Sequence, residues 1–232
     1  MKKILFILLL LAMVYPVQAR KILITRHGQV GFEEYFDHEV KELKLTPLGR
    51  EQAALLGNYL KNVCQFDGKI LVSPILRTVE TGVIIGDVLN KKVVLEPGIQ
   101  EVNTGDNTRC MNIAEFEARF SGKFTTAKNF THPWRVVNEN PEIWRKRYIR
   151  EMDRILTEYD GDLLLVTHGG GIGSMVHELC RRGNLKVPGL GFNCALFIFE
   201  LDENNTVLST KYVIDYIPHA DVTDNRGYPN RD

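Results

Sequence analysis

The hydrophobic positions of the chain form short, nearly continuous apolar runs, separated by longer segments with apolar residues three to four apart. Unbroken apolar runs are typical of strands buried on both faces of a sheet, and three-to-four spacing is typical of helices that cover such a sheet. The last two runs form a predicted hairpin around Asn204 and Asn205. The predicted strands span residues 21–25, 70–72, 92–95, 162–167, 195–201 and 207–214.

Several segments with helical spacing begin at recognisable start positions. Thr46 and Pro47 fit an N-cap followed by the first helical residue, and Ser73 with Pro74 repeats the arrangement. A longer helix is predicted to start at Asn140 and Pro141, and two further helices span residues 113–120 and 172–182. Because strands alternate with helices, the pattern predicts an α/β fold, a three-layer α/β/α arrangement with a mostly parallel central sheet.

Residues 1–19 have the composition of a secretory signal peptide. Two lysines precede an apolar run over residues 4–14, and Ala19 ends a stretch of small residues where a signal peptidase would cut. The alternative, a retained membrane anchor, is disfavoured because the run is well short of the ~20 residues that a spanning helix needs. We therefore expect cleavage after Ala19, a periplasmic or secreted protein, and no stable membrane association of the mature chain.

The rest of the chain has the length expected of one domain, and 44% of all residues are hydrophobic. We place this domain at residues 20–217, with an insertion over the active site at 106–138 and a polar tail at 218–232. Without residues 1–19 the chain keeps 27 basic and 29 acidic residues, a formal charge of −2. This balance provides no general field for polyanions, so we expect no nucleic-acid partner.

The four cysteines show neither CxxC pairing nor a metal-binding pattern. In an exported protein an even number permits disulfides, whose pairing the sequence leaves open, and buried free thiols are an equal alternative. The oligomeric state is also open. The cysteines are Cys64, Cys110, Cys180 and Cys194.

Arginine and histidine residues follow two of the predicted strands directly. Arg26 and His27 come after the strand at 21–25, and His168 comes after the strand at 162–167. The carboxyl ends of parallel strands share one edge of a sheet, where open α/β sheets bind ligands, so the two histidines would meet there. A neutral imidazole can attack phosphorus, while a second imidazole and arginines neutralise the oxygens around it.

Arg77 and three glycines add to this group. Arg77 lies four residues after the expected N-cap Ser73, so its guanidinium can fold back beside the free amides of a helix start and bind an anion. Gly28, Gly169 and Gly170 lack a Cβ and would let the backbone approach a ligand closely. These positions predict a phosphate site at the sheet edge.

In order and context, five segments of the chain resemble the histidine phosphatase superfamily, also called phosphoglycerate mutase-like. They run from residue 21 to about 175, and any one of them alone would be weak evidence. The segments are Thr25-Arg26-His27-Gly28, Leu45-Thr46-Pro47-Leu48-Gly49 with Gln52-Ala53, Ser73-Pro74-Ile75-Leu76-Arg77-Thr78-Val79-Glu80-Thr81, Glu101 with Gly105, and Val166-Thr167-His168-Gly169-Gly170.

The resemblance implies a role for each matching residue. His27 corresponds to the nucleophile that accepts the phosphoryl group, and Glu101 to the acid that protonates the leaving oxygen. Glu96 lies in the same loop and stays an alternative acid; Glu101 is preferred because Gly105 follows it as in the family. No metal or other cofactor is implied. The groups expected to bind the phosphate oxygens are Arg26, Arg77, His168 and Gly169.

The chain departs from the family pattern shortly after the first histidine. Val30 and Glu33 stand where many members have Ser or Thr and Asn, which add phosphate contacts. Each missing hydrogen bond to a charged group is worth about 1.5 to 3 kcal/mol. We therefore expect weaker phosphate binding with the same type of reaction.

The resemblance implies a phosphomonoester hydrolase that forms a phosphohistidine on His27 and acts on a small-molecule phosphate ester. A phosphoglycerate mutase-like phosphotransferase is disfavoured, because the family's tryptophan-asparagine pair after the first histidine and its basic-aromatic stretch after the acid are absent. A non-catalytic phosphate-ligand binding protein is the third hypothesis, which Glu33 favours slightly. Basic residues in the insertion could contact further phosphates or sugar hydroxyls, or form a solvated surface: Arg109, Arg119, Lys123, Lys128 and Arg135.

Overall fold

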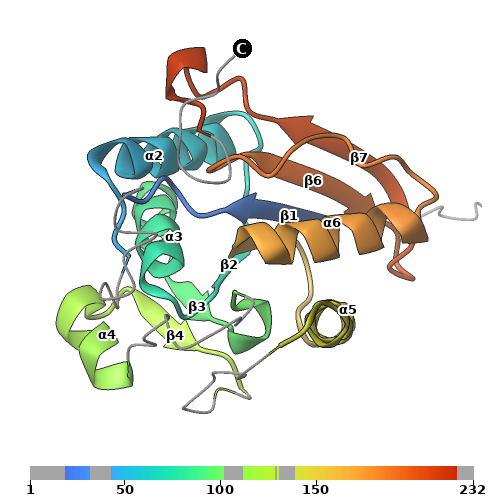
Figure 1. Cartoon of the computed structure of the whole chain (residues 1–232), viewed down its shortest axis with the longest axis horizontal. Helices are drawn as coiled ribbons and strands as arrows, with labels where there is room; N and C mark the ends of the chain where they lie inside the picture. The colour runs from blue at the N-terminus through green and yellow to red at the C-terminus, as the bar shows by residue number, and fades with distance from the viewer. Residues whose placement is uncertain (1–18, 32–42, 102–111, 129, 131–138, 224–232) are drawn as a thin grey trace, which may run out of the picture.

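A computed structural model describes residues 19–31, 43–101, 112–128, 130 and 139–223. Within them, one seven-stranded sheet has the order β4-β3-β2-β5-β1-β6-β7 (Figure 1). The pairs along β4-β3-β2-β5-β1 are parallel, and β6 and β7 join antiparallel as a hairpin. The strands are β1 (Arg20–Arg26), β2 (Lys69–Val72), β3 (Val93–Leu95), β4 (Phe124–Thr126), β5 (Leu163–Thr167), β6 (Leu196–Leu201) and β7 (Val207–Val213).

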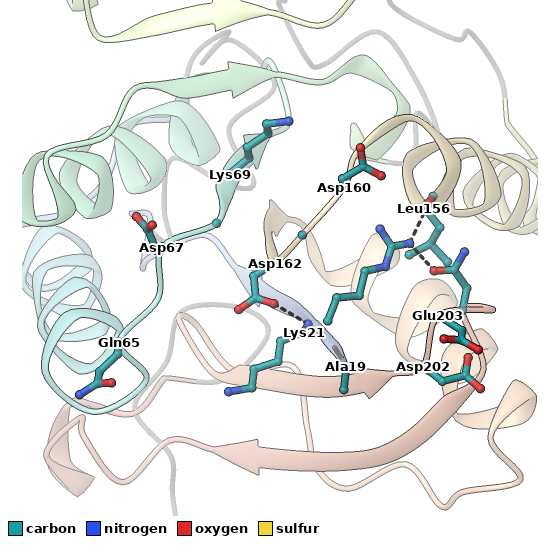
Figure 2. Close-up of a pocket in the computed structure, with 14 residues that line it drawn as sticks. Ala19, Lys21, Gln65, Asp67, Lys69, Leu156, Asp160, Asp162, Asp202 and Glu203 are labelled. Atoms are coloured by element: carbon teal, nitrogen blue, oxygen red, sulfur yellow. Dashed lines mark hydrogen bonds between the residues drawn. The ribbon is translucent and has the colours of Figure 1, made fainter. Parts of the chain in front are cut away.

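The two edges of the parallel strands differ in what they carry. At the amino-terminal edge, where Lys21, Lys69 and Asp162 lie, there is a cavity of about 680 Å³ (Figure 2). Its wall includes the backbone amide of Lys21, which donates to Asp162 Oδ1 at 2.7 Å. The carboxyl-terminal edge carries His27 and His168, so the predicted chemistry lies at the opposite end of the strands from this cavity.

Helices cover both faces of the sheet, which confirms the three-layer α/β/α prediction. Residues of α2 and α3 pack on one face, and residues of α5 and α6 pack on the other. Within the described residues, no helix is both long and apolar enough to cross a membrane. The helices are α2 (Pro47–Asn62), α3 (Leu76–Leu89), α4 (Ile113–Phe120), α5 (Pro141–Glu158) and α6 (Gly169–Arg182), with short 3₁₀ turns η1 (Pro97–Ile99) and η2 (His219–Asp221).

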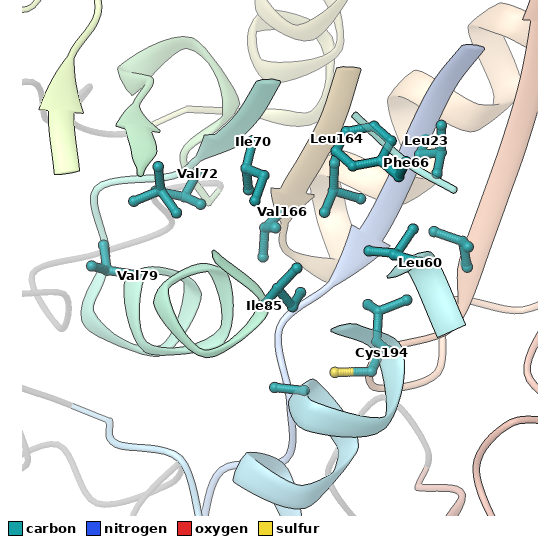
Figure 3. Packing of buried hydrophobic residues seen from close by; sticks show 14 of the residues in the cluster. Leu23, Leu60, Phe66, Ile70, Val72, Val79, Ile85, Leu164, Val166 and Cys194 are labelled. Carbon is teal, nitrogen blue, oxygen red and sulfur yellow. The ribbon is translucent and has the colours of Figure 1, made fainter. Parts of the chain in front are cut away.

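Alternate residues of the central strands bury their side chains in the two opposite layers. Leu23, Leu164 and Val166 belong to the cluster under α2 and α3 (Figure 3), whereas Ile24 and Leu165 belong to the cluster under α5 and α6. All five are at most 1% exposed. Burial on both faces explains why these strands appear in the sequence as unbroken apolar runs.

The predicted starts of α2 and α5 are confirmed. The Thr46 hydroxyl accepts a hydrogen bond from the amide of Gly49, and the Asn140 side chain accepts from the amides of Glu142 and Ile143. These side chains satisfy backbone donors that have no partner inside the helix. Helix α4 has the predicted bounds.

The predicted starts of α3 and α6 are wrong. Helix α3 begins at Leu76 with Ile75 as N-cap, because the Ser73 hydroxyl bonds to His168 instead of capping the helix. Helix α6 begins at Gly169, three residues earlier than predicted, because His168 takes the N-cap position directly after β5. Helix α6 therefore starts directly after His168, whereas α3 starts two residues later than predicted.

Two parts of the expected domain division contain packed residues. Part of the insertion expected over the active site extends the sheet instead: β4 pairs with β3, and Phe116 of α4 is fully buried in the core beside Phe124. Within the expected polar tail, Val222 and Thr223 are also buried, whereas residues 218–220 are exposed. Of the cysteines in the described residues, Cys64, Cys180 and Cys194 are free thiols.

Candidate active site

The loop after β1 holds His27 in place through contacts with distant parts of the chain. The His27 amide donates to Thr167 O at 3.0 Å, and Asn193 Nδ2 donates to His27 O at 2.9 Å. A Cβ on Gly28 would lie 2.3 Å from Gly49 O, so the absence of a side chain serves contact with α2. We expected Gly28 to permit approach to a ligand; its close approach is to another segment of the backbone.

Hydrogen bonds on both ring nitrogens fix the tautomer of His27. Arg77 Nε donates to His27 Nε2 at 3.1 Å, so Nε2 carries the lone pair. The proton therefore resides on Nδ1, which lies 2.8 Å from Gly28 O. Burial, followed by the charges of Arg77 and Arg26, holds the pKa of His27 well below its usual value. His27 is thus a neutral imidazole with its lone pair toward a guanidinium.

His168 lies beside His27, with ring centroids 5.4 Å apart and planes at 61°. It is fully buried, and its Nε2 lies 2.8 Å from Ser73 Oγ. Burial, then the charge of Arg77, lowers the pKa of His168 well below its usual value. Its Nδ1 has no hydrogen-bond partner within the described part of the chain.

Ser73 is a site residue that the sequence analysis interpreted as a helix cap. The position did hold the necessary information, because Ser73 follows β2 at the same sheet edge as the two histidines. The amide of Ser73 also donates to Val166 O at 3.1 Å, which fixes it beside the strand that ends at His168. The position of Ser73 at the end of a parallel strand is therefore a signal for a site residue, just as its position before a helix is a signal for an N-cap.

Glu101 lies across the site from His27. Its Oε2 is 3.9 Å from Arg77 Nη2 and 3.8 Å from His168 Nδ1. The Glu101 side chain is 20% exposed, whereas His27, Arg77 and His168 are at most 4% exposed as residues. Glu101 is therefore the most solvent-accessible of these four groups.

Glu96, the alternative acid, is occupied elsewhere. Its side chain is fully buried and pairs with Arg154 Nη2 at 2.6 Å. It also accepts from the amide of Gly98 as the N-cap of η1. Glu96 therefore anchors the start of the loop that carries Glu101, and the structure brings Glu101, not Glu96, to the histidines.

Arg26 and Gly169 lie next to each other at the same edge. Arg26 is buried, and its charge contributes to the low pKa of both histidines after burial and Arg77. A Cβ on Gly169 would lie 3.9 Å from Arg26 Nε. The first residue of α6 thus adds a helix amino terminus to two guanidinium groups, and together they favour an anion.

The remaining predicted residues lie away from this cluster or outside the described residues. Val30 is buried and forms an isolated bridge with Leu45, so it packs where other members bind phosphate. Lys123 pairs with Asp87 of α3 at 2.6 Å, and Arg119 and Lys128 are exposed. Residues outside the described ranges are Glu33, Gly105, Arg109, Cys110 and Arg135.

The arrangement brings two imidazoles, two guanidinium groups and a carboxyl group into one cluster. Two neutral imidazoles lie among two arginines, so the region between them is electropositive without a protonated histidine. Within the described residues, no group of three or more His, Cys, Asp or Glu side chains could hold a metal ion. The cluster has the groups needed for an in-line phosphoryl transfer to His27 Nε2.

Known proteins resemble this chain in sequence. The family model described as histidine phosphatase superfamily (branch 1) matches residues 22–213. The mitochondrial serine/threonine-protein phosphatase Pgam5 of Caenorhabditis elegans is 47% identical over 66 residues, which make up 28% of this chain and 21% of that protein. The match thus spans about a fifth of the length of this curated relative.

Solved structures share the fold. The ecdysone phosphate phosphatase of Bombix mori, in complex with tungstate, has a TM-score of 0.58 at 19% identity, covering 86% of this chain and 93% of that chain. A mycobacterial glucosyl-3-phosphoglycerate phosphatase with VO3 has a TM-score of 0.56 at 19% identity, covering 84% and 98%. The protein histidine phosphatase SixA, complexed with tungstate, has a TM-score of 0.51 at 19% identity, covering 84% and 94%.

Proposed function

The chain belongs to the histidine phosphatase superfamily, branch 1, and we propose that it is a phosphomonoester hydrolase that works through a phosphohistidine on His27. The observation that carries this proposal is the hydrogen bond from Arg77 Nε to His27 Nε2 at 3.1 Å. It aims the lone pair of a neutral imidazole at the group that would hold the phosphate oxygens. His168 lies beside His27, and Glu101 Oε2 lies 3.8 Å from His168 Nδ1.

In the first half-reaction, His27 Nε2 attacks the phosphorus of the ester. The N–P bond forms while the P–O bond to the alcohol breaks, and protonated Glu101 gives its proton to the leaving oxygen. Arg77 moves from the lone pair to the phosphoryl oxygens, where Arg26 also contributes positive charge. We assign the Ser73 hydroxyl as the donor to His168 Nε2, 2.8 Å away. This assignment leaves the His168 proton on Nδ1, from which it can be donated to a phosphoryl oxygen.

In the second half-reaction, water replaces the alcohol. The Glu101 carboxylate takes a proton from a water molecule as its oxygen attacks phosphorus. The N–P bond breaks, and neutral His27 and inorganic phosphate are restored. The same acid thus acts as base, as microscopic reversibility requires.

Trapping of the phosphoenzyme tests this proposal. The protein is mixed with 4-nitrophenyl phosphate, quenched in alkali to preserve phosphohistidine, and the modified residue is located by mass spectrometry. We expect transient phosphate on His27, and complete loss of both phosphate and turnover in His27→Ala. The matched control is His177→Ala, an exposed histidine of α6, which should behave as wild type. Turnover in His27→Ala would refute the nucleophile.

The same experiment separates the two alternatives. A mutase-like phosphotransferase would hold the phosphate stably on His27 until a second substrate accepts it. A binding protein would never be labelled. We propose a small-molecule phosphate ester as substrate, and a panel of sugar phosphates, phytate, nucleotides and phospho-amino acids identifies its class.

We also propose that the protein is exported and cleaved after Ala19. Residues 1–19 support this by composition. Cleavage there leaves β1 whole, including the Arg20 guanidinium, which donates to Tyr159 O and Leu156 O at 2.6 Å. Amino-terminal sequencing of the protein from its native cells should begin at Arg20; a retained amino terminus would refute cleavage.

A further inference from the structure

The three residues before Glu101 have their carbonyl groups bound by side chains from other elements. Arg147 Nη1 donates to Gly98 O at 3.0 Å, and Thr167 Oγ1 donates to Ile99 O at 2.8 Å. Gln100 O accepts from both terminal nitrogens of Arg147, at 3.3 and 3.4 Å, and from the Tyr148 hydroxyl. The loop that ends at Glu101 is thus fixed at three consecutive residues.

Arg147 is itself held by a buried carboxylate. Its Nε and Nη2 donate to the two oxygens of Glu139 at 2.6 and 2.8 Å, and the two side chains are 6% and 0% exposed. A guanidinium has five N–H donors. Two of them bind Glu139 and the other three bind carbonyls of the loop, so the whole fork is used.

Tyr148 completes the support from α5. Burial raises its pKa, so the hydroxyl keeps the proton that it donates to Gln100 O. The Arg147 guanidinium lies 4.3 Å above the Tyr148 ring centroid, which couples the two side chains. Arg147 also contributes, after burial and nearer charges, to the low pKa of His168.

We propose that Arg147, locked by Glu139, is a positioning residue for the proton donor: it holds the carbonyls of Gly98 and Gln100 so that the Glu101 carboxyl group stays within about 4 Å of Arg77 and His168. This inference rests on the proposed function, since Glu101 must act as the acid. All five N–H donors of Arg147 bind Glu139 or carbonyls of the loop, so Arg147 acts through the position of Glu101.

Leaving-group dependence measures whether Glu101 is in position. An alkyl phosphate needs a proton on its leaving oxygen, whereas 4-nitrophenol leaves with little protonation. A displacement of about 1 Å in a catalytic group can reduce a rate on the order of 10²-fold. We therefore expect Arg147→Gln to slow single-turnover formation of phosphohistidine from an alkyl phosphate by about 10- to 100-fold. The rate with 4-nitrophenyl phosphate should fall less than about threefold.

The single-turnover rate is measured by rapid quench because it excludes dephosphorylation, which uses Glu101 for every substrate. In Arg147→Gln, the affinity for the alkyl phosphate and for 4-nitrophenyl phosphate should change little. The matched control is Arg150→Gln, which removes an exposed arginine from α5 whose guanidinium pairs with the neighbouring Glu151 at 3.0 Å. We expect this control to affect both substrates equally.

Tyr148→Phe is a milder variant that tests the same inference if Arg147→Gln does not fold. It removes only the hydroxyl that binds Gln100 O, and should give a smaller loss with the same preference for the alkyl phosphate. Arg147→Lys, which keeps the charge without the fork, should resemble Arg147→Gln rather than wild type.

Combination with Glu101→Gln gives the decisive comparison. If Arg147 acts through Glu101, Arg147→Gln should add almost nothing to the loss on the alkyl phosphate once the acid is gone. Equal losses on both substrates, full additivity with Glu101→Gln, or no loss in any variant would overturn the inference. Absence of phosphohistidine in the wild type would instead refute the proposed function.

Discussion

Replacing Arg77 by lysine separates the positive charge of this side chain from its geometry. Arg77 turns one edge of its guanidinium into the site, with Nε at 3.1 Å from His27 Nε2 and Nη2 at 3.9 Å from Glu101. This edge can hold two phosphoryl oxygens at once, whereas an ammonium group is a single point of charge. Arg77→Lys therefore keeps the field and loses about one hydrogen bond to the phosphate.

The magnitude follows from the type of bond lost. A hydrogen bond to a charged group is worth about 1.5 to 3 kcal/mol, and each 1.36 kcal/mol is about a factor of ten. We expect kcat/KM of Arg77→Lys to fall by about 10- to 150-fold. Steady-state kinetics with 4-nitrophenyl phosphate measure this loss, since that substrate has little need of the acid.

The pH profile distinguishes charge from geometry. His27 must be neutral to attack, and its pKa is held below the usual value by burial and then by Arg77 and Arg26. The acidic limb of kcat/KM should therefore stay in place in Arg77→Lys. In Arg77→Met the pKa of His27 should rise, and the limb should move to higher pH. Activity of Arg77→Lys equal to wild type, or limbs that move alike in both variants, would refute this reasoning.

Three further predictions concern the supports of the site. Ser73→Ala leaves a buried nitrogen of His168 without its hydrogen-bond partner, so we expect the free energy of unfolding to fall by about 1 to 3 kcal/mol. The same change should reduce kcat. Denaturant unfolding and kinetics equal to wild type would contradict this prediction. Gly28→Ala places a Cβ 2.3 Å from Gly49 O, so we expect the free energy of unfolding to fall by about 1 to 3 kcal/mol. The control Gly173→Ala has open space around its Cβ and should not destabilise the protein in the same assay. The pKa values of His27 and His168 are lowered in the folded protein, so below the unfolded-state pKa of about 6.5 only the unfolded chain takes up these two protons. The free energy of unfolding should therefore decrease as the pH is lowered, by up to about 2.7 kcal/mol per pH unit. Calorimetry between pH 6.5 and 5.5 should show a smaller slope in His27→Gln, and an unchanged slope would contradict this prediction.

Local sequence patterns were sufficient to predict the features that depend on short-range interactions. Strands buried on both faces must be apolar along their length, and the caps at Thr46 and Asn140 satisfy amides only two or three residues away. The strand ends also placed His27 and His168 at one edge, because parallel strands share their direction. These features required no knowledge of distant contacts.

Contacts between distant parts of the chain assign the roles of residues that local sequence patterns do not distinguish. Glu96 and Glu101 lie in one loop, and the arginine near each carboxyl group separates their tasks: Arg154 binds the first and Arg77 lies beside the second. Ser73 has the same local sequence context as a helix cap, but its hydroxyl bonds to a histidine 95 residues away. The role inferred for Arg147 likewise depends on carbonyls 47 and 49 residues away. Contacts of this kind come from packing of whole elements, which no local pattern encodes.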